Sequence, residues 1–287
     1  MDAAGLQILA AALLFSTGGA AVKATAFDSW QVASFRSGVA AAALLLLLPS
    51  ARRNWSPRVL LVGFAYAATM VLYVMGNKLT TAANTIFLQS TAPLYLLLFG
   101  PLLLKEPVRR SDALLMAVVA AGMALFFVGE QQPLATAPDP LTGNVLSAVS
   151  GVTWALTIAG LRWLERRQGR GGMATVVAGN LIACLACLPF ALPVGAPRPI
   201  DWAVVGYLGV FQISAAYLFL TRAIGRVPAL KTSLLLLAEP AVNPVWAWLV
   251  HGERPGGLAL LGGGLILSGT LLNVLRKGGR EAGAPPA

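Results

Sequence analysis

Charged residues are scarce in this sequence. Only 11% of its 287 residues are Asp, Glu, Lys or Arg, whereas 57% are hydrophobic and the mean hydropathy is +0.74. A water-soluble domain has roughly a quarter of its residues charged, because its surface must be hydrated. The sequence therefore predicts an all-α integral membrane protein and excludes an ordinary soluble domain.

Residues that usually perform chemistry are also scarce. The sequence has one histidine, His251, and two cysteines, Cys184 and Cys187, which share one apolar segment. No second pair or histidine cluster completes a metal site, and no nucleophile has an acid/base partner. No GxxxxGK[ST] loop is present. We therefore expect no catalytic residue, no metal and no cofactor, and predict that the chain is not an enzyme or an ATP-driven pump.

Basic residues outnumber acidic ones, with a formal net charge of +10. They lie in short clusters between apolar segments, without the interleaved aromatics typical of nucleic-acid binding, so we expect no nucleic-acid partner. The apolar segments have about the 20 residues that a transmembrane helix needs. Ten such helices are predicted, at 4–23, 30–48, 58–77, 82–104, 111–129, 142–163, 173–191, 202–222, 228–250 and 257–275.

The basic clusters also predict the orientation of the chain. With the N-terminus inside, 16 of the 21 basic residues fall in inner loops or the C-terminal tail, and 4 fall in outer loops. Lys and Arg concentrate in cytoplasmic loops, so both termini are predicted to be cytoplasmic. No positive segment precedes the first apolar stretch, and we expect residues 4–23 to be a retained helix rather than a cleaved signal.

An internal repeat relates residues 88–107 to residues 237–255. At an offset of 147 positions, Pro93 aligns with Pro240 and Glu106 with Glu253. Five spans separate the equivalent positions, so the two halves must cross the membrane in opposite directions. The predicted units are a first five-helix repeat at 1–130, a polar periplasmic linker at 131–141, a second five-helix repeat at 142–276 and a disordered cytoplasmic tail at 277–287.

Ten spans in two halves, with a proline midway along spans four and nine and a glutamate thirteen residues later, resemble the EamA family of the drug/metabolite transporter superfamily. The segment LLLLAEPAVNPVWAWLVHGERP resembles the family's second-half pattern most, whereas the first half departs from it with Ala92-Pro93 and Lys105-Glu106. The whole pattern is most similar to YddG-type amino-acid exporters.

The resemblance implies a bacterial inner-membrane secondary transporter. It would export aromatic and other apolar amino acids, and similar small amphiphilic metabolites, by alternating access, with a small-molecule substrate and the bilayer as its partners and a monomer sufficient for transport. Efflux of drugs or organic cations is the nearest alternative, and a passive facilitator without ion coupling is another. A lipid-modifying membrane enzyme and a static protein that merely retains the repeat are further alternatives.

Glu239 is the most notable candidate site residue. It lies 11 residues after Pro228, which is about 16 Å along a helix and so close to mid-membrane. A carboxylate there is unfavourable by about 2.5–3.5 kcal/mol unless it faces a cavity or is protonated. We expect either a proton site or a partner for a substrate ammonium, or else a structural acid near Pro240. The sequence leaves both interpretations open.

Other polar and aromatic residues recur at helical spacing and are predicted to line a cavity. One stripe in span three includes Tyr66, Tyr73 and Asn77, and one in span nine includes Glu239, Asn243 and Trp246. Interhelical hydrogen bonding is the alternative role for such residues. The candidate substrate-binding residues are Ser16, Thr17, Tyr73, Asn84, Tyr95, Trp154, Tyr217, Glu239 and Trp246.

Two further features concern the same spans. Small polar breaks at 16–19 in span one and 150–154 in span six occupy corresponding places in the two halves and are expected to adjoin the binding site. Arg36 lies only six residues into span two. It could bind a substrate carboxylate, but we favour the interpretation that it snorkels to the headgroups.

Overall fold

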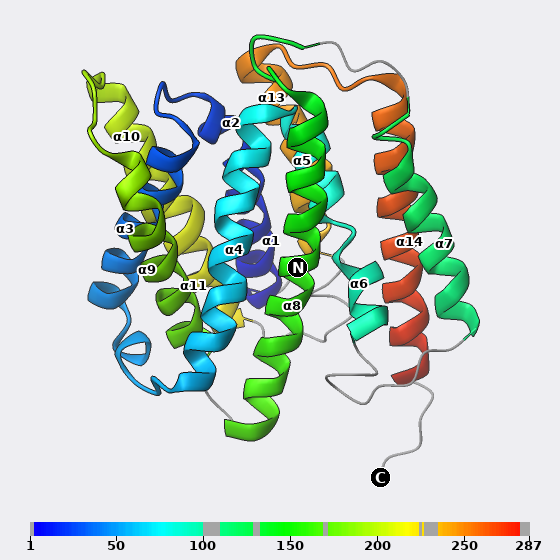
Figure 1. Cartoon of the computed structure of the whole chain (residues 1–287). Coiled ribbons are helices and arrows are strands. Elements are labelled where there is room, and N and C mark those ends of the chain that lie inside the picture. The colour runs from blue at the N-terminus through cyan, green and yellow to red at the C-terminus, as the bar shows by residue number, and fades with distance from the viewer. Residues whose placement is uncertain are drawn as a thin grey trace.

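A computed structural model describes residues 3–99, 110–128, 133–168, 172–223, 226 and 235–281. These residues are helical apart from short connections, and the one β-type pairing among them is an isolated bridge between Leu134 and Ala137, within the predicted linker. Figure 1 shows the helices standing side by side in one bundle. The predicted all-α architecture is confirmed for this part of the chain.

The helices of the N-terminal part precede the linker. They are α1 (Ala3–Ser16), α2 (Gly18–Lys23), α3 (Ser29–Leu47), the 3₁₀ helix η1 (Pro49–Arg52), α4 (Pro57–Leu79), α5 (Ala82–Gln89), α6 (Ala92–Phe99) and α7 (Arg110–Ala124).

The helices of the C-terminal part follow the linker. They are α8 (Pro140–Gln168), α9 (Gly172–Ala191), α10 (Pro199–Tyr207), the π-helix η3 (Leu208–Ala215), α11 (Ala216–Ala223), α13 (Ala238–His251) and α14 (Gly257–Glu281). Helix α14 extends through residues 277–281, which are the first residues of the predicted disordered tail.

Several of these helical segments are long and apolar enough to cross a membrane, so the chain is a multi-pass membrane protein. In the described residues they are Ala3–Lys23, Ser29–Leu47, Pro57–Leu79, Pro140–Leu164, Gly172–Ala191 and Pro199–Leu220. The apolar part of α14, Gly257–Leu272, is shorter. The total of ten spans and the cytoplasmic position of both termini remain predictions.

Helix starts follow the local sequence. Asp28 accepts a hydrogen bond from the Gln31 backbone N–H at 2.8 Å, while the Gln31 side chain bonds back to the Asp28 N–H, forming a capping box before α3. The hydroxyls of Ser56 and Thr81 each accept one hydrogen bond, from the backbone N–H three residues later, and so cap α4 and α5. At its other end, α13 stops at Gly252, whose φ of 67° is readily adopted by glycine.

Three of the spans predicted to carry the site are interrupted, those predicted at 4–23, 82–104 and 228–250. Helices α1 and α2 meet at Thr17, and α5 and α6 meet at Ser90 and Thr91. These hydroxyls bond to carbonyls three or four residues earlier, and such bonds compete with the regular helical ladder. A third interruption, at Leu237, lies three residues before Pro240, which has no N–H to donate. Ser90 and Leu237 are 147 residues apart, the offset of the sequence repeat.

The small polar segment at 150–154 does not interrupt its helix, because α8 is continuous through it. Gly151 serves close packing instead. A Cβ atom there would lie 2.9 Å from the Leu88 carbonyl oxygen of α5, so the missing side chain lets the two helices approach.

Helices at corresponding positions in the two parts of the chain pack against corresponding helices of the opposite part. Helix α4 packs on α8 and α9, while η3 packs on α1 and α3 and α11 packs on α1. Helix α5 packs on α8, and α13 packs on α1. Helices α3 and α9 pair with each other, as do α7 and α14. The C-terminal end of α13 adjoins the N-terminal end of α5, where Glu253 accepts a hydrogen bond from the Ala82 N–H at 2.9 Å, so these helices run in opposite directions.

Candidate functional site

Two glycines after the first break bring α2 close to polar groups on three other helices. A Cβ atom on Gly18 would lie 2.8 Å from the Gln212 amide nitrogen and 3.4 Å from the Tyr73 hydroxyl. A Cβ atom on Gly19 would lie 2.8 Å from the Asn243 amide oxygen. The small residues predicted at 16–19 therefore permit a convergence of polar side chains beside the break.

The amide groups in this region are buried and incompletely hydrogen-bonded. Asn77 and Asn243 are fully buried, and Gln212 is 7% exposed. The oxygen of Gln212 has no hydrogen-bond partner among the described residues, and the amides of Asn77 and Asn243 form none of standard length and angle there, although both lie beside the Tyr73 hydroxyl. Each unsatisfied buried group is unfavourable by about 1–3 kcal/mol. Such an arrangement suits a polar ligand that supplies the missing donors and acceptors.

Arg36 joins this region from α3, and its predicted snorkelling to the headgroups is wrong. The residue is 1% exposed, and its Nη2 donates to the Met70 carbonyl at 3.1 Å. Its guanidinium carbon lies 5.8 Å from the centroid of the Tyr73 ring, within cation–π range. Arg36 is buried because its face of α3 points at α4 and η3, which hydropathy alone does not reveal.

Glu239 lies beside the third break, as the second residue of α13, and is half-buried. It interacts electrostatically with Tyr73 and Tyr217, and the same two tyrosines interact with Arg36. No ion pair or hydrogen bond joins Glu239 to another residue in the described part of the chain, where the ion pairs are Lys23–Glu253 and Arg198–Asp201. Predicted residues Tyr73, Tyr217 and Glu239 thus share one region.

Ser16, Thr17 and Trp246 form a second group, next to the first. The Trp246 indole N–H donates to the Ser16 hydroxyl at 3.0 Å, and the hydroxyls of Thr17 and Tyr207 are 2.8 Å apart. Thr17, Tyr207 and Trp246 line a groove of about 390 Å³ between α2, α10 and α13, whose other walls are apolar.

The contacts of the remaining candidates are different. The Asn84 amide donates to the Thr80 hydroxyl at 3.3 Å and to Asn144 at 3.1 Å. The Tyr95 hydroxyl donates to a methionine sulfur at 3.4 Å, and Trp154 lies half-buried on α8. A substrate contact for these three residues stays a prediction.

Sequence reasoning did not name Gln212 and placed Arg36 outside the site. Gln212 is the only amide in the apolar segment LGVFQISA, and a single polar residue produces no periodic pattern. Its one recorded hydrogen bond is long, 3.5 Å to the Phe15 carbonyl. A lone amide within a membrane span was the available signal.

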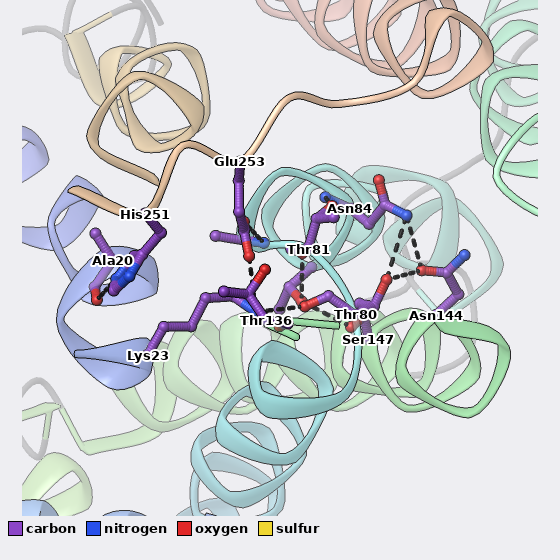
Figure 2. A network of polar contacts seen from close by, with 12 residues as sticks. Ala20, Lys23, Thr80, Thr81, Asn84, Thr136, Asn144, Ser147, His251 and Glu253 are labelled. Atoms are coloured by element: carbon purple, nitrogen blue, oxygen red, sulfur yellow. Dashed lines mark hydrogen bonds and ion pairs between the residues drawn. The ribbon is translucent and has the colours of Figure 1, made fainter. Parts of the chain in front are cut away.

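One end of the bundle is closed by a buried ion pair, shown in Figure 2. Lys23 Nζ lies 3.1 Å from a Glu253 carboxylate oxygen, and their side chains are 3% and 2% exposed. The ammonium also donates to the carbonyls of Thr80, at 2.8 Å, and Thr136. Because Glu253 also accepts from the α5 backbone, these contacts join α2, α5, the linker and the end of α13. We call this set the Lys23–Glu253 lock.

Known proteins share both the sequence pattern and the fold. The profile of the EamA-like transporter family matches residues 3–128 and again residues 141–275. The pseudopaline exporter CntI of Pseudomonas aeruginosa strain UCBPP-PA14 is 26% identical over 279 residues, covering 91% of this chain and 92% of its own. The threonine/homoserine exporter RhtA of Escherichia coli strain K12 is 26% identical over 219 residues, covering 75% of this chain and 70% of its own.

A solved crystal structure superposes with a TM-score of 0.62 at 20% identity, covering 95% of this chain and 96% of its own, which shows a shared fold. The family profile accounts for nearly the whole chain and confirms the predicted family. The two exporters are transporters rather than enzymes. The apolar helices, the interrupted spans and the family profile agree, and the chain belongs to the EamA-like transporter family within the drug/metabolite transporter superfamily.

Proposed function

We propose that the chain is a secondary transporter that exports amino acids, aromatic and other apolar ones among them, and similar small amphiphilic metabolites across the bacterial inner membrane. The observation that carries this proposal is the buried polar region at the first helix break, where tyrosine, guanidinium and amide groups converge and the Arg36 Nε and several amide atoms are incompletely hydrogen-bonded. Interrupted membrane helices commonly form substrate sites in transporters. A small-molecule substrate and the bilayer are the proposed partners, and a monomer is sufficient.

Alternating access between two inverted repeats is the proposed mechanism. Three observations support repeats at 1–130 and 142–276: the family profile matches twice, equivalent helices exchange packing partners, and α5 runs opposite to α13. A pair of inverted repeats can adopt two shapes that open the same central site to opposite sides.

The Lys23–Glu253 lock is proposed to separate in one of these two shapes. It closes the end of the bundle that contains the linker, which we predict to be periplasmic. At the repeat offset, Glu106 corresponds to Glu253 in the sequence, and Glu106 lies outside the described residues. Ion pairs that form in one shape only are a common basis for such two-state changes.

The names of the relatives support the amino-acid class, because one of them exports threonine and homoserine. Efflux of organic cations is the second candidate, favoured by the half-buried Glu239 among tyrosines. Arg36 argues against it, since a second cation near the same tyrosines would be repelled.

The test is uptake of labelled phenylalanine and leucine into proteoliposomes, with and without a pH gradient, by the native chain and by Glu239→Gln. Accumulation that follows the gradient and is lost in the variant would support proton-coupled export. Saturable equilibration that ignores both the gradient and the substitution would identify a facilitator and assign Glu239 to structure. If labelled amino acids do not move but a labelled organic cation does, the proposed substrate class is wrong.

A further inference from the structure

Two opposite charges occur near the same tyrosines without pairing with each other. Arg36 is fully buried, its Nε has no hydrogen-bond partner, and the carbonyl and sulfur of Met70 are its only recorded polar contacts among the described residues. Glu239 has no ion pair there either. A buried charge is strongly unfavourable when it is uncompensated. Each of the two groups therefore lacks a counter-charge that a ligand could provide.

The position of Tyr73 relates these charges to the polar region. Its ring lies beside the Arg36 guanidinium, and its hydroxyl faces Gly18 at the first break. Glu239 lies one helical turn before Asn243 on the same face of α13, and the Asn243 amide reaches Gly19 at the first break. Both Tyr73 and Tyr217 also interact electrostatically with Arg36 and with Glu239. The cation and the carboxylate are thus placed around one pair of tyrosines, with the amides of Asn77, Gln212 and Asn243 nearby.

We propose that Arg36 binds the carboxylate of the substrate and that Glu239 binds its ammonium group, so that the site selects zwitterionic amino acids. The inference rests on the proposed function, whose substrate class it makes specific. A guanidinium presents paired N–H donors that match a carboxylate, and a carboxylate accepts hydrogen bonds from an ammonium group. The incompletely hydrogen-bonded amides then bind the remaining polar atoms, and the absence of side chains at Gly18 and Gly19 leaves α2 near the ligand.

Other ligand charges fit this site less well. A simple amine would leave Arg36 uncompensated and add a second positive charge near Tyr73. A simple carboxylic acid would leave Glu239 uncompensated. A site that hydrogen-bonds a group strongly rejects an analogue that lacks it, because the site's own polar group is then left unpaired. Only a ligand with both charges satisfies both residues.

The experiment measures binding to the purified full-length chain of phenylalanine, phenethylamine and 3-phenylpropionate. The leucine series, with 3-methylbutylamine and 4-methylpentanoate, repeats it with an aliphatic side chain. The variants are Arg36→Gln, Arg36→Lys and Glu239→Gln. Arg53→Gln is the matched control, because Arg53 is exposed beside η1. Transport of the same labelled amino acids in proteoliposomes is measured in parallel.

We expect the native chain and Arg53→Gln to bind the amino acid about 30-fold or more tightly than either analogue, the scale for truncating one partner of a buried charge pair. The Arg36→Gln variant should no longer bind the amino acid more tightly than the amine. The Glu239→Gln variant should no longer bind the amino acid more tightly than the acid. Retained binding of the amine shows that Arg36→Gln is folded. If it does not fold, Arg36→Lys and the analogue series on the native chain decide.

Equal binding of amino acid and amine by the native chain would overturn the inference, as would an Arg36→Gln variant that still prefers the amino acid. Binding of neither series would overturn it too. If vesicles transport amino acids while Arg36→Gln keeps its preference, the inference fails and the proposed function stands. If the binding pattern is as expected but vesicles show no transport, the inference stands and the proposed function fails.

Discussion

Replacing Glu253 by glutamine should open the bundle at the end that the Lys23–Glu253 lock closes. Glutamine keeps an acceptor for the Ala82 N–H but removes the negative charge, which leaves the 3% exposed Lys23 side chain with two carbonyls as partners. Removing one partner of a buried ion pair is destabilising by about 3–5 kcal/mol. If both groups are hydrated in the open shape, the substitution raises the free energy of the closed shape only. An increase of about 3 kcal/mol shifts the equilibrium between the two shapes roughly 100-fold toward the open one.

The assay is labelling of a reporter cysteine by a membrane-impermeant maleimide added from outside. Asn77→Cys is the reporter, because Asn77 is fully buried and lies one helical turn before Thr80, and serine replaces Cys184 and Cys187. A cysteine at the buried Ala155 of α8 monitors general unfolding. Glu253→Gln should accelerate labelling of the first reporter only, and adding Lys23→Met should reverse most of the effect. An unchanged labelling rate would refute the argument.

Three other substitutions probe the breaks and the caps. Gly18→Ala places a methyl group 2.8 Å from a neighbouring amide and should reduce transport strongly, whereas Gly264→Ala, which meets nothing within 4 Å, should not; equal transport rates would contradict this. Trp246→Phe removes the hydrogen bond to Ser16 and should lower the free energy of unfolding by about 1 kcal/mol, measured by thermal melting in detergent. Asp28→Ala removes a capping box and should lower that free energy by about 0.5–2 kcal/mol without changing transport.

The positions of the helices were predictable because apolar length and charge clusters are strong, additive signals. The break at 16–19 was also predictable, since Ser16 and Thr17 can bond to their own backbone. At 150–154 the small residues leave α8 continuous and serve close packing, as Gly151 does, because a small polar segment need not interrupt a helix. Periodicity identified Tyr73 and Asn243, which lie on stripes of similar residues.

Arg36 and the Lys23–Glu253 lock show what sequence reasoning could not supply. Depth within a span does not say which face of the helix a residue occupies, so Arg36 was assigned to the headgroups although its face contacts α4. Lys23 and Glu253 are 230 positions apart; Lys23 ends the predicted span 4–23, and Glu253 lies three residues beyond the predicted span 228–250. Their pairing depends on how α2 and α13 pack, which is a tertiary property.

The π-helical segment η3 lies between α10 and α11 and makes the middle of span eight differ from a regular α-helix. In it, backbone bonds run to the fifth residue along the chain rather than the fourth, and the Ser214 hydroxyl bonds to the Gly209 carbonyl at 2.8 Å across that wider loop. The turn therefore holds one residue more than an α-helical turn. Gln212 lies within this widened turn, is 7% exposed and approaches Gly18 of α2. Span eight consequently contains a joint that needs no proline, and a tilt of α10 against α11 can move Gln212 without unfolding either helix.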